Sequence, residues 1–332
     1  MNTLTLSRFA TTAALAVTLV ACGDDGGDLS PDAPAGPVSI VATAQSTPEL
    51  STLVAAVQFA SNDGDLLNLL SSPGTLTVFA PTNAAFDALA VELTGVPGTT
   101  GAALLTEANK PLLRAVLQYH VLTSEVASSA IPFGLPITSA EGSVFKIDTG
   151  TPPVITDGRN RTARITATDI DASNGVVHLI DKVILPADKN VVQTAQALAA
   201  ANPAEFTILV EAVVAADLAG TLSGAGPFTV FAPTDAAFAA LLTELGVTKA
   251  QLLANTALLT QVLTYHVVPG RVFKAAVPVG AAIATVETGT FTVNASLQIT
   301  DERGRTARIV GTDTLTSNGV IHVLDRVILP AP

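Results

Sequence analysis

Residues 77–86 read TVFAPTNAAF, and residues 229–238 repeat them as TVFAPTDAAF. In each copy apolar residues alternate with others up to a proline, which is typical of a β-strand. Pro81 ends the strand because proline has no N–H to donate to a sheet. Thr82 is then a suitable N-cap for a helix that carries Phe86 on its apolar side. The motif predicts a structural corner, a strand followed at once by a helix, with no nucleophile or metal ligand in it.

Two further blocks repeat in the same order. They are LQYHV at 117–121 with LTYHV at 263–267, and SNGVVHLIDKVILP at 173–186 with SNGVIHVLDRVILP at 317–330. The offset between the copies falls from 152 to 146 and then to 144 residues, always between blocks, so the length differences belong to the connections. A period of about 150 residues suits a whole domain rather than a solenoid unit. We therefore expect two copies of one domain, at residues 38–187 and 188–332.

The third block begins with a turn signal. Asn174-Gly175 between apolar runs predicts a β-hairpin, because both residue types tolerate a positive φ. The strand that follows is apolar on both faces, as expected of a central strand. His178 and its copy His322 lie on this strand, and we interpret both as hydrogen-bonded core histidines.

The N-terminus has the pattern of an export signal. Arg8 precedes a short apolar run, which is too short to span a bilayer. The run ends in LVAC at residues 19–22, which resembles the bacterial lipobox. We therefore expect residues 1–21 to be a lipoprotein signal peptide and Cys22, the only cysteine, to be the lipid attachment site. An ordinary signal peptide with an incidental cysteine is the alternative.

The segment after the cysteine is acidic and rich in glycine and proline. Residues 22–37 contain four aspartates and few apolar side chains, which predicts a flexible tether. Gly23 follows Cys22 directly, whereas an aspartate there would favour retention in the inner membrane. The sequence thus predicts an exported bacterial lipoprotein, preferentially in the outer membrane, with its body in the periplasm or exposed at the surface.

Composition excludes several classes of function. The 332 residues carry 16 Lys and Arg against 28 Asp and Glu, a net charge of −12, which argues against a nucleic-acid partner. A single cysteine excludes an intramolecular disulfide and a cysteine-cluster metal site. No Gly-x-Ser-x-Gly motif occurs, and all four histidines lie in repeated blocks. We expect no enzyme activity, no metal and no cofactor.

A Tyr-His pair occurs in both copies, as Tyr119-His120 and Tyr265-His266. His120 continues an apolar stripe at helical spacing, so the simpler interpretation is a buried, neutral histidine bonded to backbone or to a hydroxyl. The alternative is a ligand or a catalytic base, although no partner residue stands at ligand spacing. We keep all four residues as candidate binding residues.

Basic residues also repeat. Arg159 and Arg161 return as Arg303 and Arg305, each pair close to aspartates in the sequence. They are candidate binding residues for a phosphate or an acidic glycan. The simpler interpretation is a solvated strand edge with cross-strand ion pairs.

Taken together, the three blocks resemble the fasciclin (FAS1) domain. Its two conserved boxes resemble residues 77–86 and 173–181, and its Tyr-His dipeptide resembles Tyr119-His120, with all three signatures present in both copies. The resemblance implies an α+β fold, with each domain a β-wedge of about seven strands and packed helices. It also implies a role in adhesion or matrix association without an established catalytic centre. In some animal members the Tyr-His region is linked to integrin binding, and this transfers weakly to a bacterial lipoprotein.

Two functions remain in competition. The first is a lipid-anchored cell-envelope protein whose tandem domains mediate adhesion or extracellular binding. Its partners would be the membrane, through the anchor, and a protein, matrix or glycan ligand that the sequence does not identify. The second is a binder of a small lipid or polysaccharide in the envelope. The absence of tryptophan counts against carbohydrate stacking.

Overall fold

The computed structural model describes residues 37–61 and 64–332. The predicted signal peptide, the lipid attachment site Cys22 and the tether up to Gly36 lie outside the described residues, so these assignments stay predictions. None of the helices in the described ranges combines the length and the hydropathy that crossing a bilayer requires.

The first domain is built from five α-helices and seven strands in the described part of the chain. The strands are β1 (Leu76–Pro81), β2 (Val121–Leu122), β3 (Pro136–Thr138), β4 (Val144–Asp148), β5 (Val154–Thr156), β6 (Thr162–Ala172) and β7 (Gly175–Ile180). The helices are α1 (Ile40–Ser46), α2 (Ser51–Ala60), α3 (Asp65–Ser71), α4 (Asn83–Thr94) and α5 (Lys110–Tyr119), with 3₁₀ helices η1 (Pro48–Leu50), η2 (Gly101–Leu104), η3 (Glu107–Asn109) and η4 (Ser128–Ala130). The strand order is β2-β1-β7-β6-β5-β4-β3. Only β1 and β7 run parallel among these neighbours.

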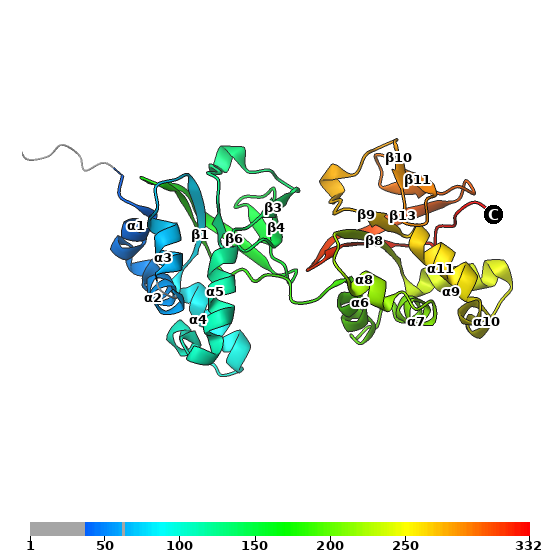
Figure 1. Ribbon diagram of the computed structural model, residues 1–332, viewed down its shortest axis with the longest axis horizontal. Coiled ribbons are helices and arrows are strands. Elements are labelled where there is room, and N and C mark those ends of the chain that lie inside the picture. Colours follow the sequence, from blue (N-terminus) through cyan, green and yellow to red (C-terminus); the bar gives the residue numbers. More distant parts are fainter. Residues whose placement is uncertain (1–36, 62–63) are drawn as a thin grey trace, which may run out of the picture. The chain divides into compact units, whose positions relative to one another are not determined.

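The second domain repeats this plan. Its strands are β8 (Phe228–Pro233), β9 (Val267–Pro269), β10 (Ala282–Ala284), β11 (Thr290–Val293), β12 (Gln298–Thr300), β13 (Thr306–Thr316) and β14 (Gly319–Leu324). Its helices are α6 (Val191–Ala199), α7 (Thr207–Ala215), α8 (Ala219–Ser223), α9 (Asp235–Leu245), α10 (Lys249–Ala254), α11 (Thr256–Tyr265) and the 3₁₀ helix η5 (Lys274–Ala276). The strand order, β10-β11-β12-β13-β14-β8-β9, is that of the first domain, written from the opposite edge of the sheet. Helices α6 to α11 lie along one side of this sheet (Figure 1). The predicted α+β fold with about seven strands per domain is confirmed.

The repeated decapeptide forms the predicted corner. β1 ends at Pro81, and the Thr82 side chain caps α4 by accepting from the Ala85 N–H at 3.4 Å. In the second domain Thr234 caps α9 in the same way. The Phe86 ring is 1% exposed, so it anchors the helix in the core.

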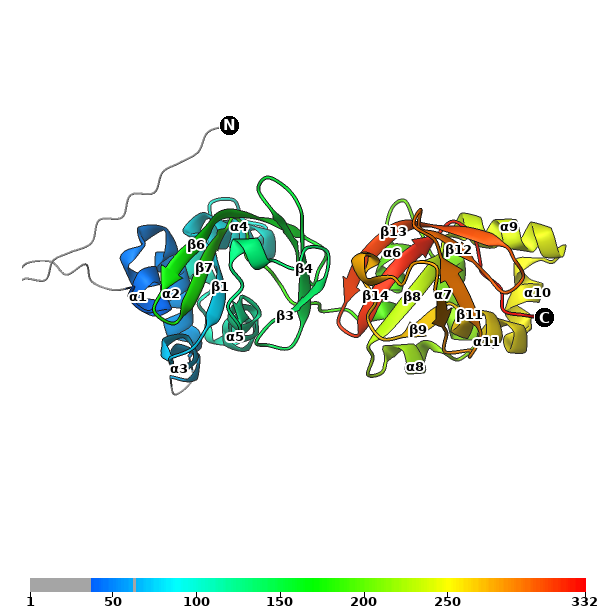
Figure 2. The same ribbon diagram turned by 90° about the horizontal axis from the view of Figure 1, so that it is seen from above.

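Each domain buries both faces of its central strands. In the first domain Val78 and Ala80 belong to the core that the helices cover, whereas Phe79 belongs to a second core enclosed by the sheet. The Phe79 ring meets Phe145 edge to face, with centroids 5.4 Å apart, a favourable aromatic arrangement. β7 is central as predicted, since it pairs with β1 on one side and β6 on the other, and these strands lie side by side in Figure 2.

The Ser-Asn-Gly turn exists, but for a different reason from the one predicted. β6 and β7 form a hairpin in which Ala172 faces Gly175. Gly175 has a φ of 144° and Asn174 is not among the positive-φ residues. A Cβ on Gly175 would lie 1.9 Å from the Leu76 carbonyl oxygen, so glycine is required by the close approach of β1. Asn174 has a different role: it is 3% exposed, and its side chain forms hydrogen bonds with the backbone of Ile40 and Leu70, outside the turn.

Candidate functional site

Tyr119 is the last residue of α5 and His120 is the C-cap. The Tyr119 side chain is fully buried in the core that the sheet encloses. Its hydroxyl donates to the Val144 carbonyl at 2.8 Å and accepts from the Gly158 N–H at 2.9 Å. Burial, with the nearby charge of Asp157, raises the pKa of Tyr119. The hydroxyl therefore stays protonated and links α5 to β4 and to the loop between β5 and β6.

His120 is buried as well, at 2% exposure. Its Nδ1 lies 2.6 Å from the Val116 carbonyl oxygen, and its Nε2 accepts from the Ile184 N–H at 3.1 Å. A neutral ring protonated at Nδ1 satisfies both contacts. Burial lowers the pKa of His120 to about 4, against the opposing effect of the Val116 hydrogen bond. This geometry agrees with the interpretation of a neutral core histidine.

Tyr265 and His266 repeat these contacts in the second domain. The Tyr265 hydroxyl accepts from the Glu302 N–H at 3.2 Å. His266 Nδ1 lies 2.7 Å from the Val262 carbonyl oxygen, and Nε2 accepts from the Ile328 N–H at 3.1 Å. Burial lowers the pKa of His266 to about 4. Both Tyr-His pairs thus hold the interior together. Their assignment as binding residues stays a prediction, and a partner would reach them only after the domain opened.

A buried aspartate organises the basic loop between β5 and β6. Asp157 is 1% exposed, and its Oδ1 accepts from the N–H groups of Arg159 and Arg161 at 3.0 and 2.9 Å. Its Oδ2 accepts from the Leu185 N–H at 3.0 Å. Burial raises the pKa of Asp157 although these hydrogen bonds oppose the shift. In the second domain Asp301 makes the same three bonds, to Arg303, Arg305 and Leu329.

Sequence reasoning missed the role of these aspartates. Both loops place a residue of positive φ three positions after the aspartate, Asn160 at 61° and Gly304 at 71°. The sequence did contain a signal for this loop. In both repeats an aspartate is followed three positions later by Asn or Gly, which tolerate a positive φ. Because backbone N–H groups of the loop bind the buried carboxylate, the loop backbone is held in place and presents its arginines in a fixed position.

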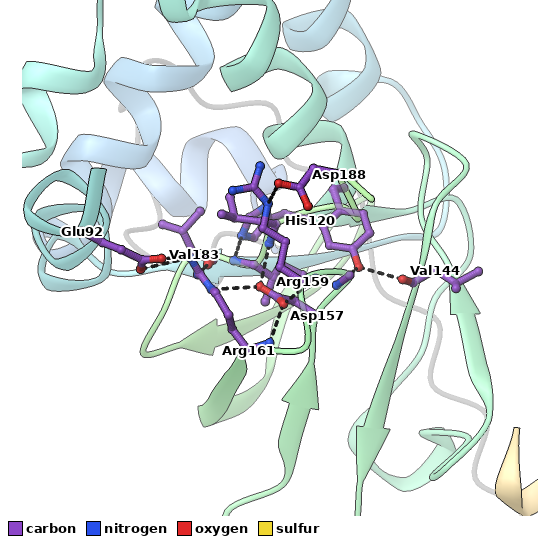
Figure 3. A network of polar contacts seen from close by, with 12 residues as sticks. Glu92, His120, Val144, Asp157, Arg159, Arg161, Val183 and Asp188 are labelled. Carbon is purple, nitrogen blue, oxygen red and sulfur yellow. Dashed lines mark hydrogen bonds and ion pairs between the residues drawn. The ribbon is translucent and has the colours of Figure 1, made fainter. Parts of the chain in front are cut away.

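Arg161 pairs with a helix and Arg159 with the segment after β7, rather than across strands, which corrects the expectation of a charged strand edge with cross-strand ion pairs. Arg161 Nη1 donates to both carboxylate oxygens of Glu92 on α4, at 3.0 and 3.1 Å, and its Nη2 donates to the Val183 carbonyl at 2.5 Å. Arg159 Nε lies 3.4 Å from Asp188 Oδ2. Figure 3 shows the Arg161 guanidinium close to the buried aspartate and the Arg159 guanidinium beside Asp188. The loop, α4 and the segment after β7 are thereby joined.

The second domain keeps one of these ion pairs. Arg305 Nη2 lies 2.9 Å from Glu244 Oε2 on α9, and this pair corresponds to Arg161 and Glu92 of the first domain. Arg303 instead donates from Nε to the Pro330 carbonyl at 2.7 Å. No carboxylate of residues 37–61 and 64–332 forms an ion pair with Arg303.

A surface hollow of about 310 Å³ lies beside the Arg161–Glu92 pair in the first domain. Glu92, Arg161 and the exposed Lys182 line it, together with small apolar side chains of α4. Lys182 corresponds to Arg326 in the second domain, which is also exposed. This arrangement can bind a polar or anionic group. Across the described ranges no cluster of three His, Cys, Asp or Glu side chains could hold a metal ion.

Comparison with protein families gives a match that covers most of the chain. A model of the fasciclin domain matches residues 48–186 and 204–330. Each matched range contains one copy of the repeated blocks, and the two ranges fall on the two domains of the structure.

Several known proteins are similar in sequence. Transforming growth factor-beta-induced protein ig-h3 of the rabbit, Oryctolagus cuniculus, is 32% identical over 262 residues, which cover 79% of this chain and 35% of that protein. Cell surface glycolipoprotein MPB83 of Mycobacterium bovis is 33% identical over 194 residues, which cover 53% of this chain and 81% of that protein. The chain thus spans about a third of the length of ig-h3 and its pig counterpart.

Among solved structures, a FAS1 domain pair from the insect cell adhesion molecule fasciclin I aligns with a TM-score of 0.41 and 17% sequence identity. The alignment covers 85% of this chain and 97% of that one.

Proposed function

The chain belongs to the fasciclin domain family, and from this premise we propose that it is a lipid-anchored cell-envelope protein whose two domains mediate adhesion or matrix binding without catalysis. The lipobox at residues 19–22 and the acidic tether support the anchor. The similarity to a cell surface glycolipoprotein of Mycobacterium bovis supports an envelope location. Adhesion is what the fasciclin resemblance implies for the body of the chain.

One observation carries the non-catalytic part of the proposal. The ionisable side chains of the Tyr-His pairs are buried, neutral and hydrogen-bonded to backbone, so they are occupied in building the scaffold. Recognition then depends on the surface, where Lys182 and Arg326 occupy equivalent exposed positions and Lys182 lies beside the Arg161–Glu92 pair. An anionic matrix or envelope polymer is the ligand that this charge favours.

The anchor and the adhesive body are tested separately. Cells that carry the full chain should retain the protein in the membrane fraction and attach to an anionic polymer surface. A Cys22→Ser variant should release the protein from membranes, and attachment of the cells should fall to that of a deletion strain. If the variant remains membrane-bound, the lipid anchor is refuted. If deletion of the whole protein leaves attachment to all surfaces unchanged, the adhesion proposal fails.

The second candidate, binding of a small lipid, is favoured by an apolar cavity in the second domain, which Phe238, Leu252 and Val262 help to line.

A further inference from the structure

The second domain encloses an apolar cavity that neither the adhesion proposal nor the repeated motifs account for. It has a volume of about 180 Å³ and lies among α9, α10 and α11. All but one of its lining side chains are Phe, Leu or Val, including Phe238, Leu252 and Val262, and the exception is Arg303. An engineered apolar cavity of about 150 Å³ in another protein binds benzene, so this volume is large enough for the apolar part of a small ligand.

The equivalent region of the first domain is filled. Its cavity has a volume of only about 30 Å³, although corresponding residues such as Phe86, Val116 and Arg159 line it. The connection between the helices explains the difference. Leu93 and Leu112 are 19 positions apart, whereas the corresponding Leu245 and Leu258 are 13 apart.

The additional residues of the first domain form η2 and η3, and η2 packs directly on α4. A Cβ on Gly101 of η2 would lie 2.6 Å from the Phe86 Cβ, so glycine is needed for this close approach. In the second domain the shorter connection forms α10 instead, and a cavity is left under it. The cavity therefore follows from a length difference between the two repeats.

The guanidinium at the cavity also differs between the domains. Arg159 is paired with Asp188, with Nε and Oδ2 3.4 Å apart. Pro332 stands at the position that corresponds to Asp188, and proline has no side-chain carboxylate. Arg303 is exposed, and its Nε donates to the Pro330 carbonyl. Its terminal N–H groups are available to bind an anion, because in the described part of the chain no carboxylate forms an ion pair with Arg303.

We propose that this cavity binds a small amphipathic carboxylate, such as a medium-chain fatty acid, with its apolar tail among α9, α10 and α11 and its carboxylate on Arg303. An apolar enclosure excludes a sugar or a free phosphate, since the hydroxyl or phosphate oxygens would be buried without partners. A guanidinium at the entrance favours a carboxylate over an alcohol of the same length, through charge-assisted hydrogen bonds. The proposal rests on the second candidate function, binding of a small lipid, and not on the adhesive function.

Octanoate and octanol are the probes, measured by calorimetric titration of the full chain from residue 22 with Cys22→Ser. Arg303→Gln should weaken octanoate binding about tenfold or more, the range expected for a lost charge-assisted hydrogen bond, and leave octanol binding unchanged. Arg159→Gln, the matched change in the first domain, should leave both affinities unchanged. Val262→Phe should fill the cavity and abolish binding of both probes, with circular dichroism used to verify that the variant is folded.

Each result separates binding in this cavity from nonspecific attraction to the protein surface. Failure of the unsubstituted protein to bind octanoate at millimolar concentration would overturn the proposal. Equal loss with Arg303→Gln and Arg159→Gln would assign the effect to surface charge and also overturn it. If a folded Val262→Phe variant binds octanoate as well as the parent does, the tail is not in this cavity. Attachment of cells should not respond to a folded Val262→Phe variant, because Val262 is 6% exposed and lies in the interior, and this distinguishes failure here from failure of the adhesion proposal.

Discussion

At the scale of the residue, the two buried Tyr-His pairs make the stability of each domain depend on pH. The folded-state pKa of His120, about 4, lies below the ordinary value of 6.5. Between these values the unfolded chain binds a proton that the folded chain does not, so stability is present above pH 6.5 and is lost as the pH falls toward 4. At pH 5 the loss from one such histidine is about 2 kcal/mol.

His120→Gln should therefore destabilise the first domain more at pH 7 than at pH 5, by about 2 kcal/mol. The glutamine cannot titrate, whereas the histidine has already lost that stabilisation at the lower pH. Urea unfolding at both pH values measures the difference. His266→Gln is the matched change in the second domain, and burial lowers the pKa of His266 to about 4 as well. A destabilisation independent of pH in both variants would contradict the assignment.

A second prediction at this scale concerns the tyrosine hydroxyl. Tyr119→Phe removes the acceptor for the buried Gly158 N–H and the donor to the Val144 carbonyl. Leaving buried polar groups unpaired should cost the first domain about 1–3 kcal/mol, with little change in packing because the ring remains. Calorimetry should show a lower melting temperature for the first domain and an unchanged melting temperature for the second domain. An unchanged melting temperature would mean that water replaces the hydroxyl.

At the scale of the element, the asparagine of the Ser-Asn-Gly motif holds three segments together. Asn174 Oδ1 accepts from the Ile40 N–H at the start of α1, at 2.9 Å. Its Nδ2 donates to the carbonyls of Leu70 and Ser72 at the end of α3, at 2.8 and 3.0 Å. These bonds satisfy groups that helix ends leave without partners. Asn318 makes the corresponding contacts with Val191, Leu222 and Gly224.

Asn174→Asp keeps the acceptor, removes both donors and brings a negative charge toward two carbonyl oxygens. We expect a loss of about 2–4 kcal/mol in the first domain, from unpaired buried groups and the buried charge. Hydrogen exchange should show faster opening of the ends of α1 and α3 than of the sheet. Asn318→Asp should move this effect to the second domain. Equally faster hydrogen exchange throughout the first domain would argue against a local role of Asn174 at the ends of α1 and α3.

Local patterns predicted the corner and the buried strands, because a proline, a capping threonine and the alternation of apolar residues act within a few positions. They did not predict the hydrogen bonds by which Asn174 joins α1 and α3 to the turn, since Asn174 and Ile40 are 134 positions apart. The Asp157 loop was missed for a related reason: three of its partners are backbone N–H groups, which every residue but proline offers. The arginines were placed on a strand edge because their sequence neighbours are acidic, whereas the partner of Arg161 on α4 is Glu92.

At the scale of the whole molecule, duplication gives one chain two equivalent exposed cations, Lys182 and Arg326. If both domains contact the same anionic surface, the second contact becomes intramolecular, and the apparent affinity rises by about 10²- to 10⁴-fold over one contact. Lys182→Glu and Arg326→Glu reverse the charge at exposed positions, where a substitution has little effect on stability. Binding to an immobilised anionic polymer, measured for the purified chain with Cys22→Ser, tests this.

Two-domain binding predicts that Lys182→Glu and Arg326→Glu each remove most of the avidity, and that the double variant binds no better than the background. Binding through one domain predicts a full loss with one substitution and none with the other. Lys189→Glu, the same change of charge at an exposed position outside the hollow, controls for net charge. Because the chain is acidic overall, a general loss with Lys189→Glu would show that net charge rather than these positions governs attachment. If Lys182→Glu, Arg326→Glu and the double variant all bind with unchanged affinity, the hollow is refuted as the adhesive surface. The fold and the family assignment would not be affected.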